Sequence, residues 1–500
     1  MVTAGGASHR FTASAYPATR RGADAAVMRR ISGATPIVLT ALLAGALLLP
    51  QSAPADTSEL PSLKARGAQT IVVDGRHGRD SNGGSARSPL RTVAAAWRRI
   101  PQARVLERPV RILIRPGRYG AKSLPNYWES RWGTKKAPIV IVAARRGTVS
   151  FGNVNLYDLR WVAFSGVNFK DHYDLFHCDR CQHVLLTRSR LVGSPKELHE
   201  NVKVNQSRDI GITHSTISGA DDNAIDFVAV QHARVTYNVI ERANDWCEYA
   251  KGGSAFVLVA HNRIRHCGTG GFTAGQGTGF QFMTAPFIRY EAYGIEVLDN
   301  LISDTEGAGI GVNGGYNIVV ARNRMWHVGM RSHLLEVGYG NRSCDGQPGD
   351  EGRQPCQQNL DAGGWGTTRV DDGSNYVRIP NRHVWILGNV IDNPRRQGDQ
   401  LLSIAAPFSG VEQDGSGLGT VRADDDLHIA GNLIAGRGLP DGADDCMASD
   451  CRELAARNTL SAHPGLFRAP THGDLRMRAP YSAPKPKLPT LSWADSTSLP

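Results

Sequence analysis

The feature that most constrains the fold of this chain is a recurring eight-residue phrase of the form apolar-x-apolar-x-x-Asn-x-apolar. Its clear copies begin at positions 257, 295, 318, 384 and 427 and read VLVAHNRI, IEVLDNLI, IVVARNRM, VWILGNVI and LHIAGNLI. Weaker copies begin at positions 162, 184, 210 and 233, so the first five copies recur with a period in the low twenties. Most later copies are more widely spaced, which fits the same unit enlarged by insertions.

This phrase predicts a right-handed parallel β-helix, an all-β solenoid. Its alternating apolar residues are typical of short strands with one buried face, and a period in the low twenties is typical of one solenoid coil. The recurring Asn falls at the bend after the strand, where stacked amides can hydrogen-bond in a ladder. A β-sandwich would need hairpin signals that are scarce here, and a propeller would need repeats about twice as long. The ladder positions are residues 238, 262, 300, 323, 389 and 432.

A second strand is expected before each phrase, and a cap is expected at the N-terminal end of the solenoid. Upstream of the repeats, residues 71–74 and 110–114 read as strands, and residues 92–100 read as an amphipathic helix. Such a helix would cover the open edge of the first coil. The second strand series is predicted at residues 201–205, 223–230, 246–253, 309–315 and 333–340.

The N-terminus has the pattern of an export signal. Arg29 and Arg30 precede the apolar run 37–49, which is followed by a small-residue site ending at Ala55. Because this run is short for a bilayer span, we predict cleavage after Ala55 rather than a membrane anchor. Translation from Met28, just before the Arg pair, is the alternative to a start at Met1 and would leave out residues 1–27. The predicted organisation is a signal peptide at 1–55, a linker at 56–69, a β-helix domain at 70–463 and an irregular Pro-rich tail at 464–500, in a secreted protein.

Export favours disulfide formation by the eight cysteines, because an oxidising compartment permits disulfides and the number of cysteines is even. The alternative, a zinc site at the Cys-x-x-Cys pair, has no second ligand pair at zinc spacing. The cysteines fall into near neighbours that predict local disulfides: Cys178 with Cys181, Cys247 with Cys267, Cys344 with Cys356, and Cys446 with Cys451.

Composition excludes some classes of protein. With 41% apolar and 21% charged residues, the chain can bury a large core and is not disordered. Its net charge of +11 is spread along the sequence and is not gathered into a nucleic-acid-binding tail. We therefore expect no nucleic-acid partner, and the positive charge favours an acidic partner only weakly.

The coil period places distant residues beside one another. If Ile225 and Phe227 point inward, Asp226 points outward, and moving back by one coil places Lys203 directly beside it. Moving forward by one coil aligns Asp226 with the residue after Tyr249, which predicts Tyr249 inward and Glu248 outward. Such a cluster of oxygen ligands suits calcium, whereas the alternative is a structural turn rich in Asp. The residues expected on or beside this exposed sheet are Lys203, Asn205, Asp221, Asp222, Asp226 and Glu248.

These motifs resemble those of the exported pectate-lyase-like β-helix proteins, and most nearly polysaccharide lyase family nine. The resemblance covers about residues 70–440 and includes the segment DGRHGRDSNGGSARSPLRTVAAAW, the Asn-bearing coils, Gly219–Asp222 with Asp226, and Tyr249–Gly253. It implies a calcium cluster at Asp221, Asp222 and Asp226 and a basic Lys251. The third Asp and the Lys are each displaced by one residue from the family pattern. By strict alternation Lys251 falls inward, unless the two glycines after it break the strand.

The implied reaction is β-elimination on a polyuronide. It needs a neutralised carboxylate, a base for the C5 proton and a departing C4 oxygen. Lys251 is the first candidate base and Lys203 the second, and the alternative for each is a solvated surface lysine. Further predicted substrate contacts are the glycine-rich segment 268–288, the aromatic residues Trp246, Tyr249, Phe280 and Phe282, and, on this sheet, Asn205, Glu248, Asn313 and Glu336.

We therefore expect an exported polysaccharide lyase that uses calcium and acts on an acidic polysaccharide. The alternatives are a glycoside hydrolase using Asp226 with Glu248 or Asp222, a C5-epimerase, and a non-catalytic carbohydrate-binding β-helix. The expected partner is the acidic polysaccharide alone, with no nucleic acid, no membrane after removal of the signal, and a monomeric state.

Overall fold

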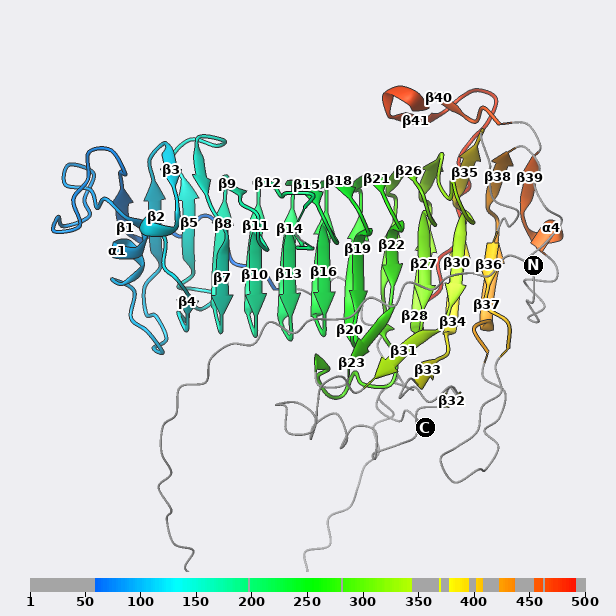
Figure 1. Ribbon diagram of the computed structural model, residues 1–500, viewed down its shortest axis with the longest axis horizontal. Coiled ribbons are helices and arrows are strands. Elements are labelled where there is room, and N and C mark those ends of the chain that lie inside the picture. Colours follow the sequence, from blue (N-terminus) through cyan, green and yellow to red (C-terminus); the bar gives the residue numbers. More distant parts are fainter. Residues whose placement is uncertain are drawn as a thin grey trace, which may run out of the picture. The chain divides into compact units, whose positions relative to one another are not determined.

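Strands dominate the computed structural model of the protein, and they stack side by side along one axis (Figure 1). The predicted signal peptide lies outside the described residues, and so do the predicted disulfides Cys344–Cys356 and Cys446–Cys451. No helix in the described part of the chain combines the length and the apolar character needed to cross a membrane. The structure describes residues 59–196, 198–279, 282–343, 368–369, 377–394, 402–407, 422–436, 454–461 and 464–491.

Three long sheets form a parallel β-helix, because each coil contributes one strand to each sheet in turn. Neighbouring strands within these sheets pair in parallel, as the repeat predicts. Sheet A contains β1 (Gln69–Val73), β2 (Val110–Ile114), β5 (Ile139–Ala143), β8 (Arg160–Ser165), β11 (Gln182–Thr187), β14 (Arg208–Thr213), β17 (Gln231–Thr236), β20 (Ser254–Ala260), β24 (Ala292–Tyr293) with β25 (Glu296–Leu298), β28 (Gly315–Ala321), β34 (Arg382–Leu387) and β37 (Asp425–Ala430).

Sheet B follows the Asn corner, so each predicted phrase spans a strand of sheet A, the corner and a strand of sheet B. Its strands are β3 (Gly117–Tyr119), β6 (Val149–Phe151), β9 (Val167–Lys170), β12 (Arg190–Val192), β15 (Thr216–Ala220), β18 (Val239–Ala243), β21 (Arg263–Cys267), β26 (Leu301–Thr305), β29 (Arg324–Trp326), β35 (Val390–Asn393), β38 (Leu433–Gly436) and β39 (Thr459–Ser461).

Sheet C is the predicted second strand series. It contains β4 (Trp128–Glu129), β7 (Val154–Tyr157), β10 (Phe176–Asp179), β13 (Val202–Asn205), β16 (Ile225–Val228), β19 (Trp246–Lys251), β22 (Gly270–Ala274), β27 (Ile310–Asn313), β30 (Leu335–Gly338) and β36 (Leu402–Ile404). The inward side chains of the three sheets form one apolar core. A small sheet of β23 (Gly277–Gly279), β31 (Gly340–Ser343), β32 (Thr368–Arg369) and β33 (Val377–Ile379) lies outside the three long sheets.

A ladder of buried asparagines joins the coils at the corner between sheets A and B. Asn262 shows the pattern: its backbone N–H and its side-chain amide both donate to Oδ1 of Asn300, at 2.9 and 3.1 Å. Its amide also donates to the carbonyl of Val235 at 2.7 Å. The predicted ladder is confirmed, and it extends one coil further to Asn458, which accepts from Asn432.

Replacing Asn300 by alanine should lower the free energy of unfolding by about 2–4 kcal/mol. The variant removes the acceptor of two Asn262 donors and the donor to the Val259 carbonyl, and all of these groups are buried. Urea or thermal unfolding measures the loss. The exposed Asn126 provides the control, because its alanine variant should unfold like the wild type. Equal stability of both variants would contradict a supporting role for the ladder.

The N-terminal end has the predicted helix, although it is shorter than expected. Helix α1 (Val93–Trp97) begins after Thr92, whose hydroxyl caps the N–H of Ala95 at 3.0 Å. Trp97 packs against Trp128 of β4 with ring centroids 4.7 Å apart, so the helix joins the same apolar core. The helix lies beside β1 at one end of the stack and covers it (Figure 1).

The Pro-rich tail is more ordered than the sequence predicts, because part of it is a packed hairpin. Strands β40 (Phe467–Ala469) and β41 (Asp474–Met477) pair antiparallel around the short 3-10 helix η3 (Pro470–His472). Phe467 and Leu475 are buried against Val390 of sheet B. Further along, Leu491 packs on sheet A. The remaining short helices are η1 (Ala121–Ser123) and α4 (Leu454–Arg457).

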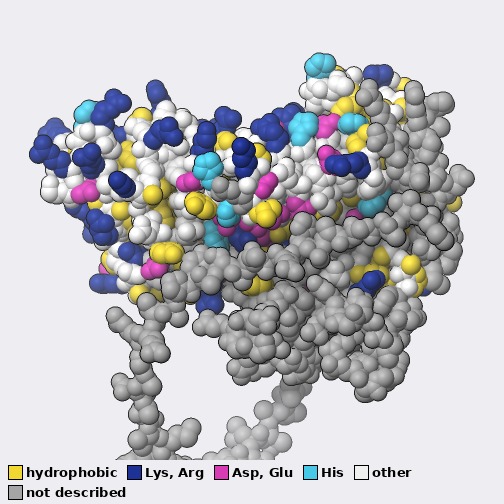
Figure 2. Space-filling view, viewed as in Figure 1, with side chains coloured by type: hydrophobic (Ala, Val, Ile, Leu, Met, Phe, Trp, Pro, Cys, Tyr) yellow, Lys and Arg dark blue, Asp and Glu magenta, His cyan; other side chains and the backbone are white. Residues whose placement is uncertain are grey.

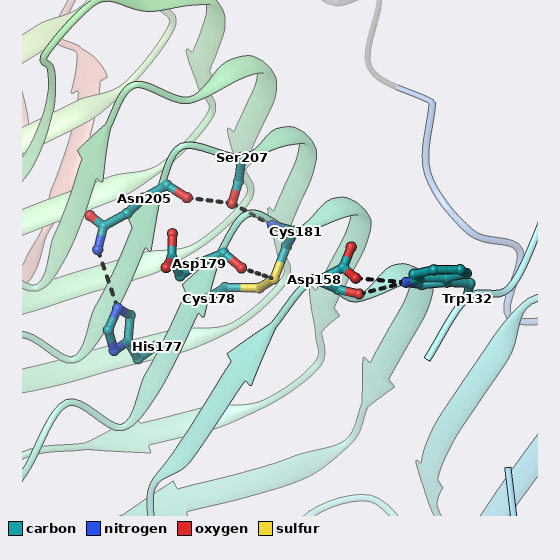
Figure 3. The surroundings of a disulfide bond; sticks show 8 residues. All are labelled: Trp132, Asp158, His177, Cys178, Asp179, Cys181, Asn205 and Ser207. Atoms are coloured by element: carbon teal, nitrogen blue, oxygen red, sulfur yellow. Dashed lines mark hydrogen bonds between the residues drawn. A yellow bond between two sulfur atoms is a disulfide. The ribbon is translucent and has the colours of Figure 1, made fainter. Parts of the chain in front are cut away.

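Two predicted disulfides are present. Cys178 and Cys181 link β10 to β11 across one corner, as Figure 3 shows, and Cys247 joins Cys267 between β19 and β21. No described cysteine is free. Both bonds are consistent with the oxidising compartment that an export signal implies.

Candidate active site

The outer face of sheet C brings together side chains from successive coils. One outward-facing row follows the strand register through His177, Lys203, Asp226, Tyr249 and Thr273. The predicted placement of Lys203 beside Asp226 is confirmed, since the two are direct register partners. The adjoining row contains Asp179, Asn205, Val228 and Lys251. In Figure 2, acidic side chains gather with several histidines over the middle of the face turned to the viewer.

The register between β16 and β19 corrects the prediction for the next coil. This coil is shorter by one residue than expected, so Asp226 pairs with Tyr249 and Ile225 pairs with Glu248. A one-residue shift of register moves every side chain to the other face of a strand. Tyr249 therefore points outward and Glu248 inward, the reverse of the expectation. Lys251 pairs with Val228 and is on the outer face without any break in the strand.

Glu248 is sealed in the apolar interior. Its register partners are Ile225 and Phe272, and its exposed fraction is 0%. Neither carboxyl oxygen has a hydrogen-bond partner. Burial raises its pKa well above the ordinary value. Glu248 therefore cannot contact a substrate or act as the predicted acid or base.

Lys251 lies at the end of β19, under the glycine-rich segment. Its Nζ is 3.0 Å from Oε1 of Gln276 and 4.2 Å from the centre of the Tyr249 ring. Only 6% of Lys251 is exposed. Gln276 belongs to the segment 268–288, so this segment forms a wall beside Lys251, as the sequence suggests. Gly252 and Gly253, with φ of 64° and 79°, then turn the chain toward sheet A.

Lys203 is surrounded by carboxylates. Its Nζ lies 2.9 Å from Oε1 of Glu200 and 3.8 Å from Oδ2 of Asp226. Burial lowers the pKa of Lys203, but the charges of Asp226, Glu200 and Asp174 outweigh this effect and raise the pKa above its ordinary value. An amine that holds its proton so firmly is a poor general base. The second candidate base is therefore better suited to act as a fixed cation.

The carboxyls around this ammonium differ in their pKa values. Burial raises the pKa of Asp226 to about 7, with a further contribution from the neighbouring Glu200, against the opposing charge of Lys203. Burial and Glu200 likewise raise the pKa of Asp222 to about 6. Burial acts upward on Glu200 too, but its contact with Lys203 lowers its pKa. The cluster thus contains both protonated and ionised carboxyls near neutral pH.

The carboxylates at the predicted calcium cluster have partners within the protein and do not fit a site for that ion. Asp221 uses both oxygens within the protein, since one accepts from the N–H of Leu198 and the other from the amide of Asn244, each at 2.7 Å. Asp222 accepts from Asn223, and Asp226 faces the Lys203 ammonium. Within the described ranges, no three His, Cys, Asp or Glu side chains are grouped to hold a metal ion. Calcium binding stays a prediction from the sequence.

The other predicted contact residues lie on the same face. The Asn205 amide is 3.2 Å from Nε2 of His177, as Figure 3 shows. Four coils beyond Asn205, the Asn313 amide donates to Glu336 at 2.8 Å, and Glu336 also contacts His333 at 3.0 Å. Asn205 therefore lies within the patch, and Asn313 and Glu336 extend it along sheet C through the later coils.

Sequence reasoning missed three residues of the site, Asp174, His177 and Glu200, and it covered Gln276 only as part of the glycine-rich segment 268–288. His177 could have been found by moving one more coil back from Lys203, since the two are register partners. Burial lowers the pKa of His177 to about 4, and the charge of Lys203 adds to this effect, so the imidazole is neutral. Asp174, Glu200 and Gln276 lie in connecting segments, which strand periodicity cannot place.

The predicted aromatic contacts divide into two groups. Trp246 and Tyr249 are buried together with Ala308, so they form part of the packing of the site. Phe282 is 49% exposed, and its carbonyl accepts from the Gln206 side chain at 3.3 Å. Phe280 lies outside the described residues. Phe282 is thus the one of these side chains that is open to a ligand in the described structure.

Comparison with known proteins finds similarity to solved structures. No family model matches the chain, and no curated protein matches it. Pectate lyase Pel9A is 12% identical with a TM-score of 0.41, over 84% of this chain and 93% of that one. A family six polysaccharide lyase from Pseudopedobacter saltans is 12% identical with a TM-score of 0.37, over 78% and 96%. XylC in complex with xylose is 8% identical with a TM-score of 0.42, over 80% and 87%. The strand pairing of the chain itself establishes the parallel β-helix.

Proposed function

We propose that the chain is an exported lyase that cleaves an acidic, uronate-containing polysaccharide by β-elimination on the outer face of sheet C. The observation that carries the proposal is the stacking of Lys203, Asp226 and Lys251 from three successive coils into one patch. In this patch Lys251 offers an amine and Lys203 a fixed cation. Asp226 offers a carboxyl with a pKa of about 7, which is partly protonated near neutral pH. The predicted signal peptide and the two disulfides support export.

Each residue has a separate role in this reaction. Lys251 takes the C5 proton on its Nζ; the C–H electrons form the C4–C5 double bond while the C4–O4 bond breaks. The departing O4 takes a proton from Asp226, whose raised pKa suits a donor at neutral pH. Lys203 has a side chain that is 29% exposed, and its ammonium stabilises the substrate carboxylate as negative charge develops beside it.

A substrate screen tests the proposal. The secreted protein is incubated with a panel of uronate polymers, and the ultraviolet absorbance of an unsaturated uronide is followed over time. We expect absorbance to rise with at least one polymer. New reducing ends without absorbance would indicate a hydrolase, and altered uronate composition without shortening would indicate an epimerase. Binding without any chemical change would indicate a carbohydrate-binding module. Each of these three results would replace the lyase assignment.

A glycoside hydrolase is the second candidate, and one observation favours it. The pKa of Asp226 is raised to about 7 and that of Asp222 to about 6, chiefly by burial, and a hydrolase needs a protonated carboxyl as its general acid. The interior position of Glu248 leaves Asp222 as the remaining partner of those predicted. Replacing Lys251 distinguishes the two reactions, because the hydrolytic mechanism does not need this amine.

A further inference from the structure

The Lys203 ammonium occupies a position among carboxylates that have little access to water. The side chains of its ion-pair partners Glu200 and Asp226 are only 7% and 4% exposed, at Nζ–O distances of 2.9 and 3.8 Å. Asp174 adds a third negative charge, which acts on the pKa of Lys203. The other oxygen of Asp226, Oδ1, is buried and has no hydrogen-bond partner.

Such a group of acids needs a positive charge to remain buried. Burying an unpaired carboxylate is strongly unfavourable, and like charges in one site repel each other. Hard oxygen ligands of this kind commonly receive a divalent cation. Here the charge is already supplied by the chain, because Lys203 extends from β13 directly beside Asp226 on β16.

We propose that the Lys203 ammonium is the resident cation of this cluster, so that the site works without a divalent metal ion. Besides its proposed contact with the substrate carboxylate, Lys203 then holds Glu200 and Asp226 in place. The catalytic consequence rests on the proposed lyase function, whereas the cation requirement does not. This assignment differs from the calcium cluster that the sequence resemblance implies for Asp221, Asp222 and Asp226.

Cation rescue tests the proposal. In Lys203→Ala the carboxylates lose their counter-charge, so the melting temperature should fall. Ethylammonium chloride or calcium chloride should raise it again with saturation, beyond the effect of potassium chloride at equal ionic strength. The wild type should show neither saturable response, and isothermal titration should detect no calcium binding to it. Lys203→Arg keeps a cation and should behave like the wild type. Lys170→Ala, at an exposed lysine of sheet B, is the matched control.

The proposal fails if the wild type binds calcium saturably and Asp226→Asn removes that binding. It also fails if both Lys203→Ala and Lys203→Gln respond to the added cations no more than Lys170→Ala does. A variant that folds only when either cation is added supports it, and one that stays unfolded with both contradicts it. If the substrate screen finds a lyase, chelation with EDTA should leave its rate unchanged within twofold. If the screen finds none, the melting and titration results still decide the identity of the cation.

Discussion

Replacing Lys251 by methionine should lower the rate of β-elimination by about 10²–10⁴-fold, the usual contribution of a positioned proton-transfer group. Methionine keeps an unbranched apolar stem against the Tyr249 ring, where Nζ now lies 4.2 Å from the ring centre. The loss should therefore appear in kcat and not in folding. Initial rates from the ultraviolet absorbance of the product measure it, and circular dichroism and the melting temperature report the fold.

Lys251→Arg separates a base from a simple cation. Arginine keeps the positive charge but cannot release its proton at neutral pH, so it should be nearly as inactive as methionine. If Lys251→Arg retains the wild-type rate, Lys251 acts only as a cation, and the proton abstraction belongs to another group. Lys170→Ala again serves as the control, because this lysine is exposed on sheet B.

The architecture could be predicted from the sequence because the repeat carries its own geometry. The Asn of each phrase occupies the same corner in every coil. Asn262 and Asn300 are therefore ladder neighbours although the coil between them is enlarged by the segment 268–288. The same reasoning placed Lys203 beside Asp226 and located Asn313 and Glu336 on one sheet. These predictions depend only on strand-to-strand stacking.

The details of the site were less predictable than the architecture, for two physical reasons. Coil lengths vary at the corners, and a one-residue difference between β16 and β19 exchanges the faces of Glu248 and Tyr249. In addition, Glu200 and Gln276 come from connecting segments whose paths have no period. The contacts of Glu200 with Lys203 and of Gln276 with Lys251 therefore became visible only in the folded chain.

Glu248→Leu should stabilise the protein, and its advantage over the wild type should grow by up to about 4 kcal/mol between pH 5 and pH 8. The wild-type carboxyl lies among apolar side chains with no hydrogen-bond partner, so folding must keep it protonated. In the unfolded chain it ionises above its ordinary pKa of 4.5. Between that value and the raised folded pKa, the folded state binds one more proton than the unfolded state. The contribution of the Glu248 carboxyl to the free energy of unfolding is therefore greatest below pH 4.5. Above that pH it falls by about 1.4 kcal/mol for each pH unit, up to the raised pKa of the folded state.

Urea unfolding at pH 5, 6, 7 and 8 measures this dependence, and a second variant isolates its cause. Glu248→Gln keeps the size and a polar group but cannot ionise, so its advantage over the wild type should increase with pH, whereas the difference between the Leu and Gln variants should stay constant. The exposed Glu129, changed to Gln, is the control and should follow the wild type at every pH. Parallel curves for the wild type and Glu248→Gln would show that the carboxyl reaches water. In that case Glu248 would face the substrate side of sheet C, and the register of β19 on which the assignment of Lys251 depends would be wrong.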